Sequence, residues 1–196
     1  MTDDELFRLI LIGGFVAVLP VGLYHRLKAA TSEKLDRRQE GLFLLISIRL
    51  LGAVGMLGLL AFMIDPTWMA WSSVPLPVWL RWVGVGLGVL AASLLIWIFR
   101  NLGKNITDTV VTRKEHFLVL TGPYRWVRHP FYVAFALAML ANSLATANWL
   151  FFVGGAVAFA LLVVRTRKEE EKLIERFGDD YRRYMATTGR FWPRFR

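Results

Sequence analysis

The sequence predicts an all-α integral membrane protein with about five transmembrane helices and a cytoplasmic C-terminal helix. Hydrophobic residues make up 56% of the 196-residue chain, whereas soluble domains contain about 45–50%. They gather in runs of about 20 residues, the length that crosses about 30 Å of hydrocarbon as a helix. Lysine and arginine gather between these runs. Apolar runs with basic connections are typical of proteins that cross a membrane several times.

The first three predicted spans cover residues 6–24, 42–64 and 76–99. Each run is close to the length that a transmembrane helix needs. The first run could instead be a cleaved signal peptide, but such a peptide starts with positive charges. Asp3, Asp4 and Glu5 occupy that position here, so we expect the run to remain as a span.

The apolar run at residues 131–164 is too long for a single span. Asn142 and Asn148 interrupt its middle. We therefore expect two short helices, at residues 131–147 and 149–164, joined by a tight turn. These helices bring the number of spans to five.

The distribution of positive charge sets the expected orientation. Residues 25–41, 100–128 and 165–196 hold five, six and ten of the 24 lysines and arginines, whereas residues 65–81 hold only Arg81. Cytoplasmic loops are richer in lysine and arginine than external ones. The N-terminus is thus expected outside and the C-terminus in the cytoplasm, in the plasma membrane if the host is prokaryotic.

Composition excludes several kinds of function. The net charge of +9 is explained by anionic lipid at the inner membrane surface, without nucleic acid. The chain has no cysteine, which excludes disulfides and thiolate metal ligands. His25, His116 and His129 are too scattered for a zinc motif, so no metal site is expected. A P-loop and a dinucleotide-binding glycine motif are absent from the sequence.

Polar residues concentrate in the second half of the chain. In the first half, Arg49 lies inside the second span, where it could extend to the surface or line a cavity. After residue 100, Gly122 and Pro123 mark a turn. Pro130 suits the first turn of the fourth span, with His129 near its cap.

A second charged segment follows the fifth span and is expected to continue that helix into the cytoplasm, ending at Gly178. Two pairs in it have the i,i+4 spacing of helical ion pairs, Arg165 with Glu169 and Arg167 with Glu171. Alone, they indicate a solvated helix end. The tight turn makes the last two spans antiparallel, however, so His129 and the start of this segment should lie close together. Converging polar groups beside apolar helices are typical of a binding site.

These segments resemble the signature of isoprenylcysteine carboxyl methyltransferases and related phospholipid methyltransferases. The first half of the resemblance is carried by His116, Leu118, Val119, Gly122, Tyr124, Arg128, His129, Pro130 and Tyr132. The second half is carried by Glu169, Glu170, Leu173, Phe177, Gly178 and Tyr181, and the closing segment GRFWPRF is also typical of the family. The two halves stand in the family's order and together span about the last hundred residues.

The resemblance implies S-adenosylmethionine as cofactor. Carried over position by position, the family's cofactor site falls on His116, Leu118, Val119, Gly122, Tyr124, His129, Tyr132 and Glu170. Its catalytic arginine and glutamate fall on Arg165 and Glu169. A shift by two residues would give Arg167 and Glu171 instead, and Leu173 with Phe177 favours the first choice.

The implied organisation is a single membrane-embedded methyltransferase domain over residues 1–196. Residues 1–100 would supply three spans, and residues 101–196 the cofactor and catalytic region with its two-span hairpin. The acceptor would be a lipophilic or lipidated molecule dissolved in the membrane, in the first place an isoprenylcysteine-like carboxylate. An amine or a thiol stays open, and so does the oligomeric state.

Two other functions remain open from the sequence. Some sterol-type reductases look similar in the same C-terminal region and use NADPH, whose extra phosphate would need a basic pocket. Arg113, Lys114, Arg125 and Arg128 could form one. The second alternative is a membrane scaffold without enzymatic activity, in which the C-terminal charges bind lipid and a partner.

Overall fold

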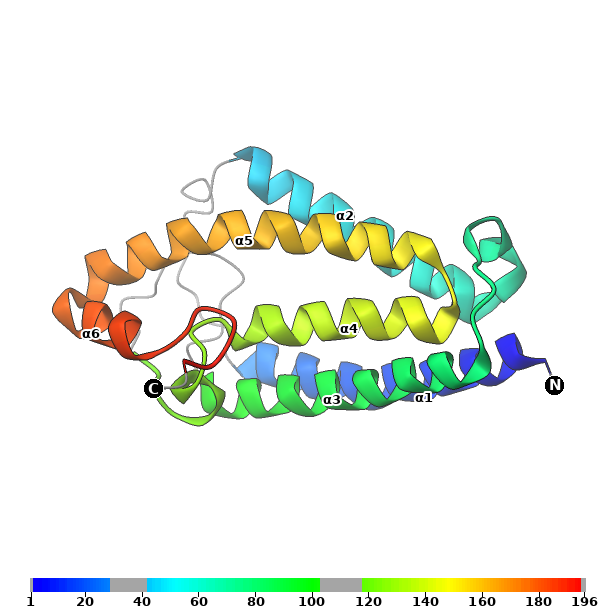
Figure 1. The fold of residues 1–196 in the computed structure, drawn as a ribbon, viewed down its shortest axis with the longest axis horizontal. Helices are drawn as coiled ribbons and strands as arrows, with labels where there is room; N and C mark the ends of the chain where they lie inside the picture. The colour runs from blue at the N-terminus through cyan, green and yellow to red at the C-terminus, as the bar shows by residue number, and fades with distance from the viewer. Residues whose placement is uncertain (1, 29–41, 103–117, 195–196) are drawn as a thin grey trace.

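The computed structural model describes residues 2–28, 42–102 and 118–194 and is an elongated helical bundle (Figure 1). The described residues contain no strand, only two isolated bridges. The α-helices are α1 (Asp3–Lys28), α2 (Leu42–Ile64), α3 (Val78–Leu102), α4 (Pro130–Thr146), α5 (Trp149–Phe177) and α6 (Asp179–Thr187). Two short 3₁₀ helices, η2 (Pro66–Ser72) and η4 (Gly122–Arg125), connect them. The predicted all-α membrane fold is confirmed.

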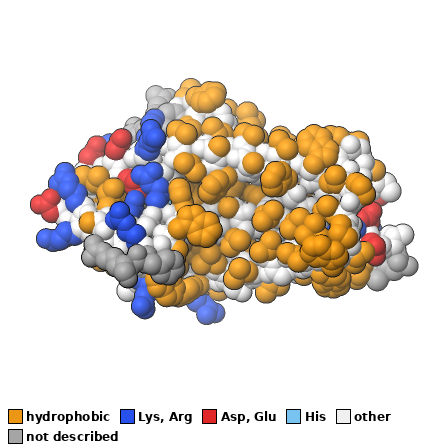
Figure 2. Space-filling view, viewed as in Figure 1, with side chains coloured by type: hydrophobic (Ala, Val, Ile, Leu, Met, Phe, Trp, Pro, Cys, Tyr) orange, Lys and Arg blue, Asp and Glu red, His pale blue; other side chains and the backbone are white. Residues whose placement is uncertain are grey.

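Four of these helices, α1, α2, α3 and α5, are long and apolar enough to cross a membrane. The remaining predicted span, α4, has 17 residues, or about 25 Å at about 1.5 Å per residue. It packs between α3 and α5, so it need not match the full thickness of the lipid. Figure 2 shows hydrophobic side chains over most of the visible face, with lysine and arginine gathered at one end.

The contact between α3 and α4 depends on small residues. A Cβ on Gly84 would lie 2.6 Å from the backbone nitrogen of Ala145 and 2.8 Å from Cβ of Leu144. Ala91 and Ala141 are also buried. Small residues let helix backbones approach closely in membranes, which explains why these two helices pack along their length.

The turn between α4 and α5 is built around Asn148, as the sequence predicted. Ala147 adopts a left-handed conformation (φ 50°) and ends α4. The Asn148 side chain accepts a hydrogen bond from the Leu150 backbone at 3.1 Å and so caps α5. Its Nδ2 also donates to Ser72 Oγ at 2.8 Å and to the Met69 carbonyl. The hairpin makes α4 antiparallel to α5, so that the start of α4 lies near the C-terminal half of α5 (Figure 1).

The C-terminal half of α5 continues beyond the apolar run and ends at Phe177, as expected. Gly178 follows with φ 56°, a conformation that favours glycine. The chain then turns into α6, which buries Tyr181 and Tyr184. Arg49 is exposed on α2.

Candidate functional site

A buried carboxylate, Glu170, forms the centre of a polar cluster where α4 starts. Arg128 Nε donates to Glu170 Oε1 at 2.9 Å, and His129 Nε2 lies 3.2 Å from the same oxygen. Arg190, from the C-terminal tail, hydrogen-bonds to both carboxylate oxygens. Only 4% of the Glu170 side chain is exposed. Three cationic or ionisable side chains thus surround one carboxylate away from solvent.

Local sequence explains why these groups meet. Pro130 occupies the first turn of α4, which fixes the start of the helix and leaves His129 as its N-cap residue. On α5, Leu162, Thr166 and Glu170 are buried and stand four residues apart, so they lie on one face of the helix. Glu170 therefore continues the inward face of a membrane helix beyond its apolar part.

Glu169 forms the second centre of the cluster. The Tyr132 hydroxyl donates to its Oε1 at 2.7 Å, and Arg165 Nε lies 3.5 Å from the same atom. His129 Nδ1 lies 3.4 Å from Oε2. The pair Arg165 and Glu169 is therefore joined to the motif on α4, with side chains that are 13% and 19% exposed.

His129 bridges the two glutamates. Burial alone lowers the pKa of a histidine, because it disfavours the charged imidazolium. Hydrogen bonds and attraction from Glu169 and Glu170 outweigh this effect, and the pKa of His129 is raised above its ordinary value. The cluster thus favours an imidazolium that donates to one carboxylate from each nitrogen. The Tyr132 ring is nearly parallel to the imidazole, with ring centroids 5.6 Å apart.

Arg128 connects this cluster to the end of α6. Its Nη1 donates to the carbonyl of Met185 at 3.2 Å and to that of Thr188. The tail also pairs with the backbone before α4, since Arg128 N donates to Gly189 O at 2.8 Å and His129 N to Arg190 O at 3.1 Å. Three segments distant in sequence are therefore held in one arrangement.

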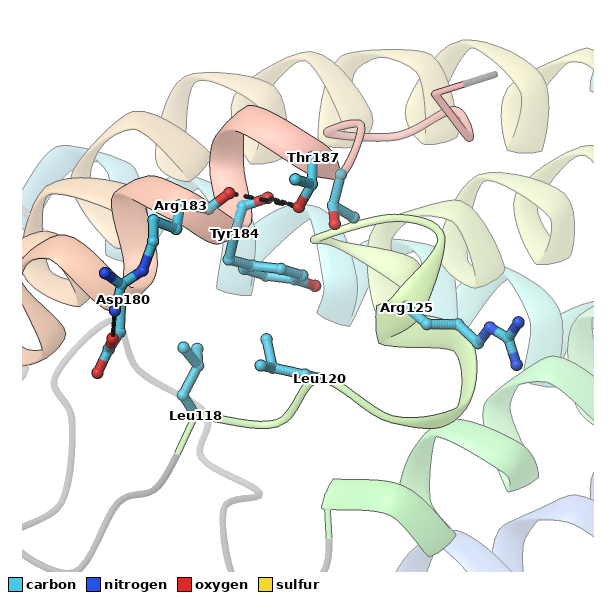
Figure 3. A pocket seen from close by; sticks show the side chains of 8 residues that line it. Leu118, Leu120, Arg125, Asp180, Arg183, Tyr184 and Thr187 are labelled. Atoms are coloured by element: carbon cyan, nitrogen blue, oxygen red, sulfur yellow. Dashed lines mark hydrogen bonds and ion pairs between the residues drawn. The ribbon is translucent and has the colours of Figure 1, made fainter. Parts of the chain in front are cut away.

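A pocket of about 560 Å³ lies between α6 and the segment at residues 118–125 (Figure 3). The Tyr184 ring faces Leu118 and Leu120, while Arg125 points away from them. The Tyr184 hydroxyl donates to the Tyr124 carbonyl, and burial raises the pKa of both tyrosines, so both stay protonated at neutral pH. The lining residues are Leu118, Leu120, Arg125, Asp180, Arg183, Tyr184, Thr187 and Thr188.

The structure brings together part of the predicted cofactor set. His129, Tyr132 and Glu170 lie in the polar cluster, and Leu118 lines the pocket. Tyr124 is connected to the pocket through Tyr184. The two remaining described members lie apart from the cluster: Val119 is half-buried, and Gly122 starts the η4 turn with φ 60°. His116 lies outside the described residues.

Two arginines of the cluster were not predicted as site residues. Arg128 stood inside the motif but was assigned only to a possible NADPH pocket, and Arg190 was noted only as part of the closing segment. Their pairing with Glu170 joins positions 42 and 20 residues away from it. Such long-range contacts leave no periodic signal in a single sequence.

The two possible arginine–glutamate pairs on α5 have different surroundings. Arg167 and Glu171 are exposed. Arg165 and Glu169 face α4 and the Tyr132 hydroxyl. The two described residues of the basic pocket suggested for NADPH have different partners. Arg128 pairs with Glu170, and the Arg125 guanidinium lies 5.0 Å from the centroid of the Trp126 ring. Arg113 and Lys114 lie outside the described residues.

Comparisons with known proteins agree with the sequence motifs. Residues 84–175 match the isoprenylcysteine carboxyl methyltransferase (ICMT) family. A methanethiol S-methyltransferase of Pseudomonas deceptionensis is 32% identical over 142 residues, covering 64% of this chain and 53% of the relative. A protein-S-isoprenylcysteine O-methyltransferase of Dictyostelium discoideum is 27% identical over 127 residues, covering 61% and 53%. The chain thus spans about half the length of these relatives.

The fold is also similar to a solved structure, that of the eukaryotic intramembrane Ras methyltransferase ICMT. The TM-score is 0.58, with 18% sequence identity over 95% of this chain and 67% of that one. At this identity the likeness concerns the fold alone. Residues 84–175 are thus similar to the isoprenylcysteine carboxyl methyltransferase family, which the two motifs also resemble, and the bundle has the fold of a member of that family.

Proposed function

We propose that this chain is an S-adenosylmethionine-dependent methyltransferase that acts on a lipophilic acceptor dissolved in the membrane. The observation that carries the proposal is the placement of Arg165 and Glu169 beside His129 and Tyr132, at one end of an apolar bundle. The relatives named above are methyltransferases of both oxygen and sulfur. We further propose that this end faces the cytoplasm, because lysines and arginines of the described residues gather there (Figure 2).

The residues present fit the proposed cofactor. The pocket volume of about 560 Å³ lies within the range of about 300–1,000 Å³ that is usual for small ligands. Leu118, Leu120 and the Tyr184 ring offer apolar and aromatic surface for a purine, and Thr187 and Thr188 offer hydroxyls. The carbonyl of Thr188, which lines the pocket, accepts a hydrogen bond from Arg128, and Arg128 in turn donates to Glu170, the partner of His129. These charged groups suit the amino-acid part of the cofactor.

The roles of the side chains follow from their chemistry. When bound, S-adenosylmethionine supplies a methyl group activated by a sulfonium. Arg165 can hold an acceptor carboxylate by paired hydrogen bonds. Glu169, fixed by Tyr132 and His129, orients Arg165 and keeps its charge near the reacting groups. A carboxylate needs no base, but it needs close placement and exclusion of water.

We propose an isoprenylcysteine-like carboxylate as the first acceptor to test, since a guanidinium beside apolar helices suits a lipid-linked carboxylate. A thiol is the second candidate, because the P. deceptionensis relative is named for methanethiol. A thiol or an amine acceptor would have to lose a proton, for which Glu169 is the available base. The three acceptors can be compared directly with the purified protein.

Calorimetric titration of the detergent-purified protein with S-adenosylhomocysteine tests the proposal. We expect saturable binding that Glu170→Ala and His129→Ala abolish, because both remove the centre of the cluster. Glu175→Ala is the matched control, an exposed glutamate on the same helix paired with Lys172. Thermal unfolding shows whether each variant is folded. Binding of NADPH in place of S-adenosylhomocysteine would indicate a reductase, and binding of neither compound would contradict an enzyme of either kind.

A further inference from the structure

Around Glu170, the contacts of the described residues hold more positive than negative charge. Two arginines, Arg128 and Arg190, pair with this one carboxylate, and His129 lies beside it. Within the described part of the chain, two positive charges against one negative charge leave an excess of one. Because a buried charge is costly without a counter-charge, the cluster favours the arrival of an anion.

The groups around Glu170 differ in how firmly they are held. Arg128 has a side chain that is 9% exposed and also donates to two backbone carbonyls of the α6 end. His129 is held from its other nitrogen by Glu169. The Arg190 side chain is 36% exposed, and within the described part of the chain its guanidinium hydrogen-bonds to Glu170 alone. Arg190 can therefore change partner without breaking another contact.

The backbone of Arg190 is fixed although its side chain is accessible. Its carbonyl accepts from His129 N at 3.1 Å, and the neighbouring Gly189 carbonyl accepts from Arg128 N at 2.8 Å. The ring of the next residue, Phe191, lies 5.9 Å from the His129 ring and 5.8 Å from that of Phe159. The guanidinium is thus presented from a fixed position beside the cluster.

We propose that Arg190 is a carboxylate-binding residue of this site. Its guanidinium leaves Glu170, which Arg128 and His129 continue to hold, and forms paired hydrogen bonds with the carboxylate of a bound ligand. The inference rests on the proposed function, under which two ligands carry such a group. They are the cofactor, through its amino-acid part, and a carboxylate acceptor.

Two nucleosides distinguish these sources with the purified full-length chain. S-adenosylhomocysteine carries the amino-acid carboxylate, whereas 5′-methylthioadenosine keeps the adenosine and the sulfur but lacks it. If Arg190 binds the cofactor, Arg190→Gln weakens S-adenosylhomocysteine binding by about 10- to 100-fold and leaves 5′-methylthioadenosine unchanged. If Arg190 binds the acceptor, both nucleosides bind as before. In that case the KM for a farnesylated cysteine with a free carboxylate rises, while that for a thiol does not.

Arg194→Gln is the matched control, since Arg194 belongs to the same tail and donates to the Ala186 carbonyl. If Arg190→Gln does not fold, Arg190→Lys provides the test. We then expect a smaller loss of affinity, confined to the ligand that carries a carboxylate. Unchanged nucleoside binding together with unchanged KM values in Arg190→Gln would overturn the inference and leave the proposed function standing. If the wild-type protein binds neither nucleoside, the proposed function fails and the inference fails with it.

Discussion

The two ends of the bundle each bury an arginine, and they use it differently. At the end that contains the α4–α5 turn, Arg81 is 5% exposed, donates to the Ala145 carbonyl at 3.0 Å and pairs with Asp4 at 2.8 Å. Its guanidinium also lies 4.1 Å from the centroid of the Phe7 ring. At the other end, Arg128 pairs with Glu170, which already contacts two further groups. We name these the turn end and the site end.

The difference lies in the balance of charge. Arg81 has one carboxylate partner and one carbonyl from the C-terminal end of a helix, where a cation is favoured. These contacts fasten α1, α3 and α4 to one another, which is a structural role. At the site end, the single carboxylate of Glu170 is paired with two arginines, so the described contacts there leave an excess of positive charge. Under the proposed function, an anionic ligand would balance this excess.

The largest expected effect concerns the site end. Arg165→Gln and Glu169→Gln should each lower kcat by about a hundredfold or more, since both remove the group that places the acceptor. Binding of S-adenosylhomocysteine should remain measurable in both variants. The measurement is methyl transfer from labelled S-adenosylmethionine to the accepted substrate.

Arg167→Gln and Glu171→Gln are the matched controls, because they carry the same charges on the exposed face of the same helix. We expect them to retain wild-type turnover. If these two variants lost activity while the first two kept it, the catalytic pair would be shifted by two residues.

The next largest effect distinguishes the turn end from the site end by comparing stability with ligand affinity. Arg81→Met should lower the free energy of unfolding by about 2 kcal/mol, because the Ala145 carbonyl loses a charged donor in a buried position. The affinity of the folded protein for S-adenosylhomocysteine should stay unchanged. Arg128→Met should lower both stability and affinity. Thermal unfolding and titration of the same detergent preparations measure the two quantities, and a loss of affinity in Arg81→Met would show that the ends are coupled.

A smaller effect is expected at the α4–α5 turn. Asn148→Ala removes the cap of α5 and the hydrogen bonds to Ser72 and Met69, and should cost about 1–2 kcal/mol in unfolding free energy. Asn142→Ala provides the comparison, because within the described residues the Asn142 side chain makes no hydrogen bond. It should cost less than about 0.5 kcal/mol. Equal losses in thermal unfolding would argue against a special role for Asn148.

These two asparagines show how far sequence alone could predict the structure. Both interrupted the same apolar run, and the break in the helix was correctly predicted. The predicted helix bounds already left Asn148 between the two helices, but the contacts that hold it there could not be predicted, because its partners Ser72 and Met69 lie 76 and 79 residues away. Apolar length and charge asymmetry predicted the helices because these properties are local in sequence.

The candidate site shows the same contrast between information that is local in sequence and contacts between distant residues. His129, Tyr132, Glu169 and Glu170 could be named because the two motifs resemble those of a known family, whose site residues were carried over position by position. Arg190 could not, since its approach to Glu170 depends on how α6 turns after Gly178 and directs the tail back over α4. The functional roles of all these residues stay predictions until the variants are measured.

The smallest expected effect is a pH dependence above about pH 6.5 that arises from His129 at the site end. The pKa of His129 is raised in the folded protein because its hydrogen bonds and attraction to Glu169 and Glu170 outweigh burial. The folded state therefore binds this proton more tightly than the unfolded chain, whose histidine pKa is about 6.5. The resulting stability is fully present below about pH 6.5 and is lost as the pH rises through the folded pKa. The midpoint of thermal unfolding should thus fall over that interval in the wild type.

His129→Gln should remove this dependence. His25→Gln, which alters a histidine stacked on Phe99, should retain it. A pH dependence that persists in His129→Gln would mean that the proton is bound elsewhere, and the cluster would then hold a neutral imidazole.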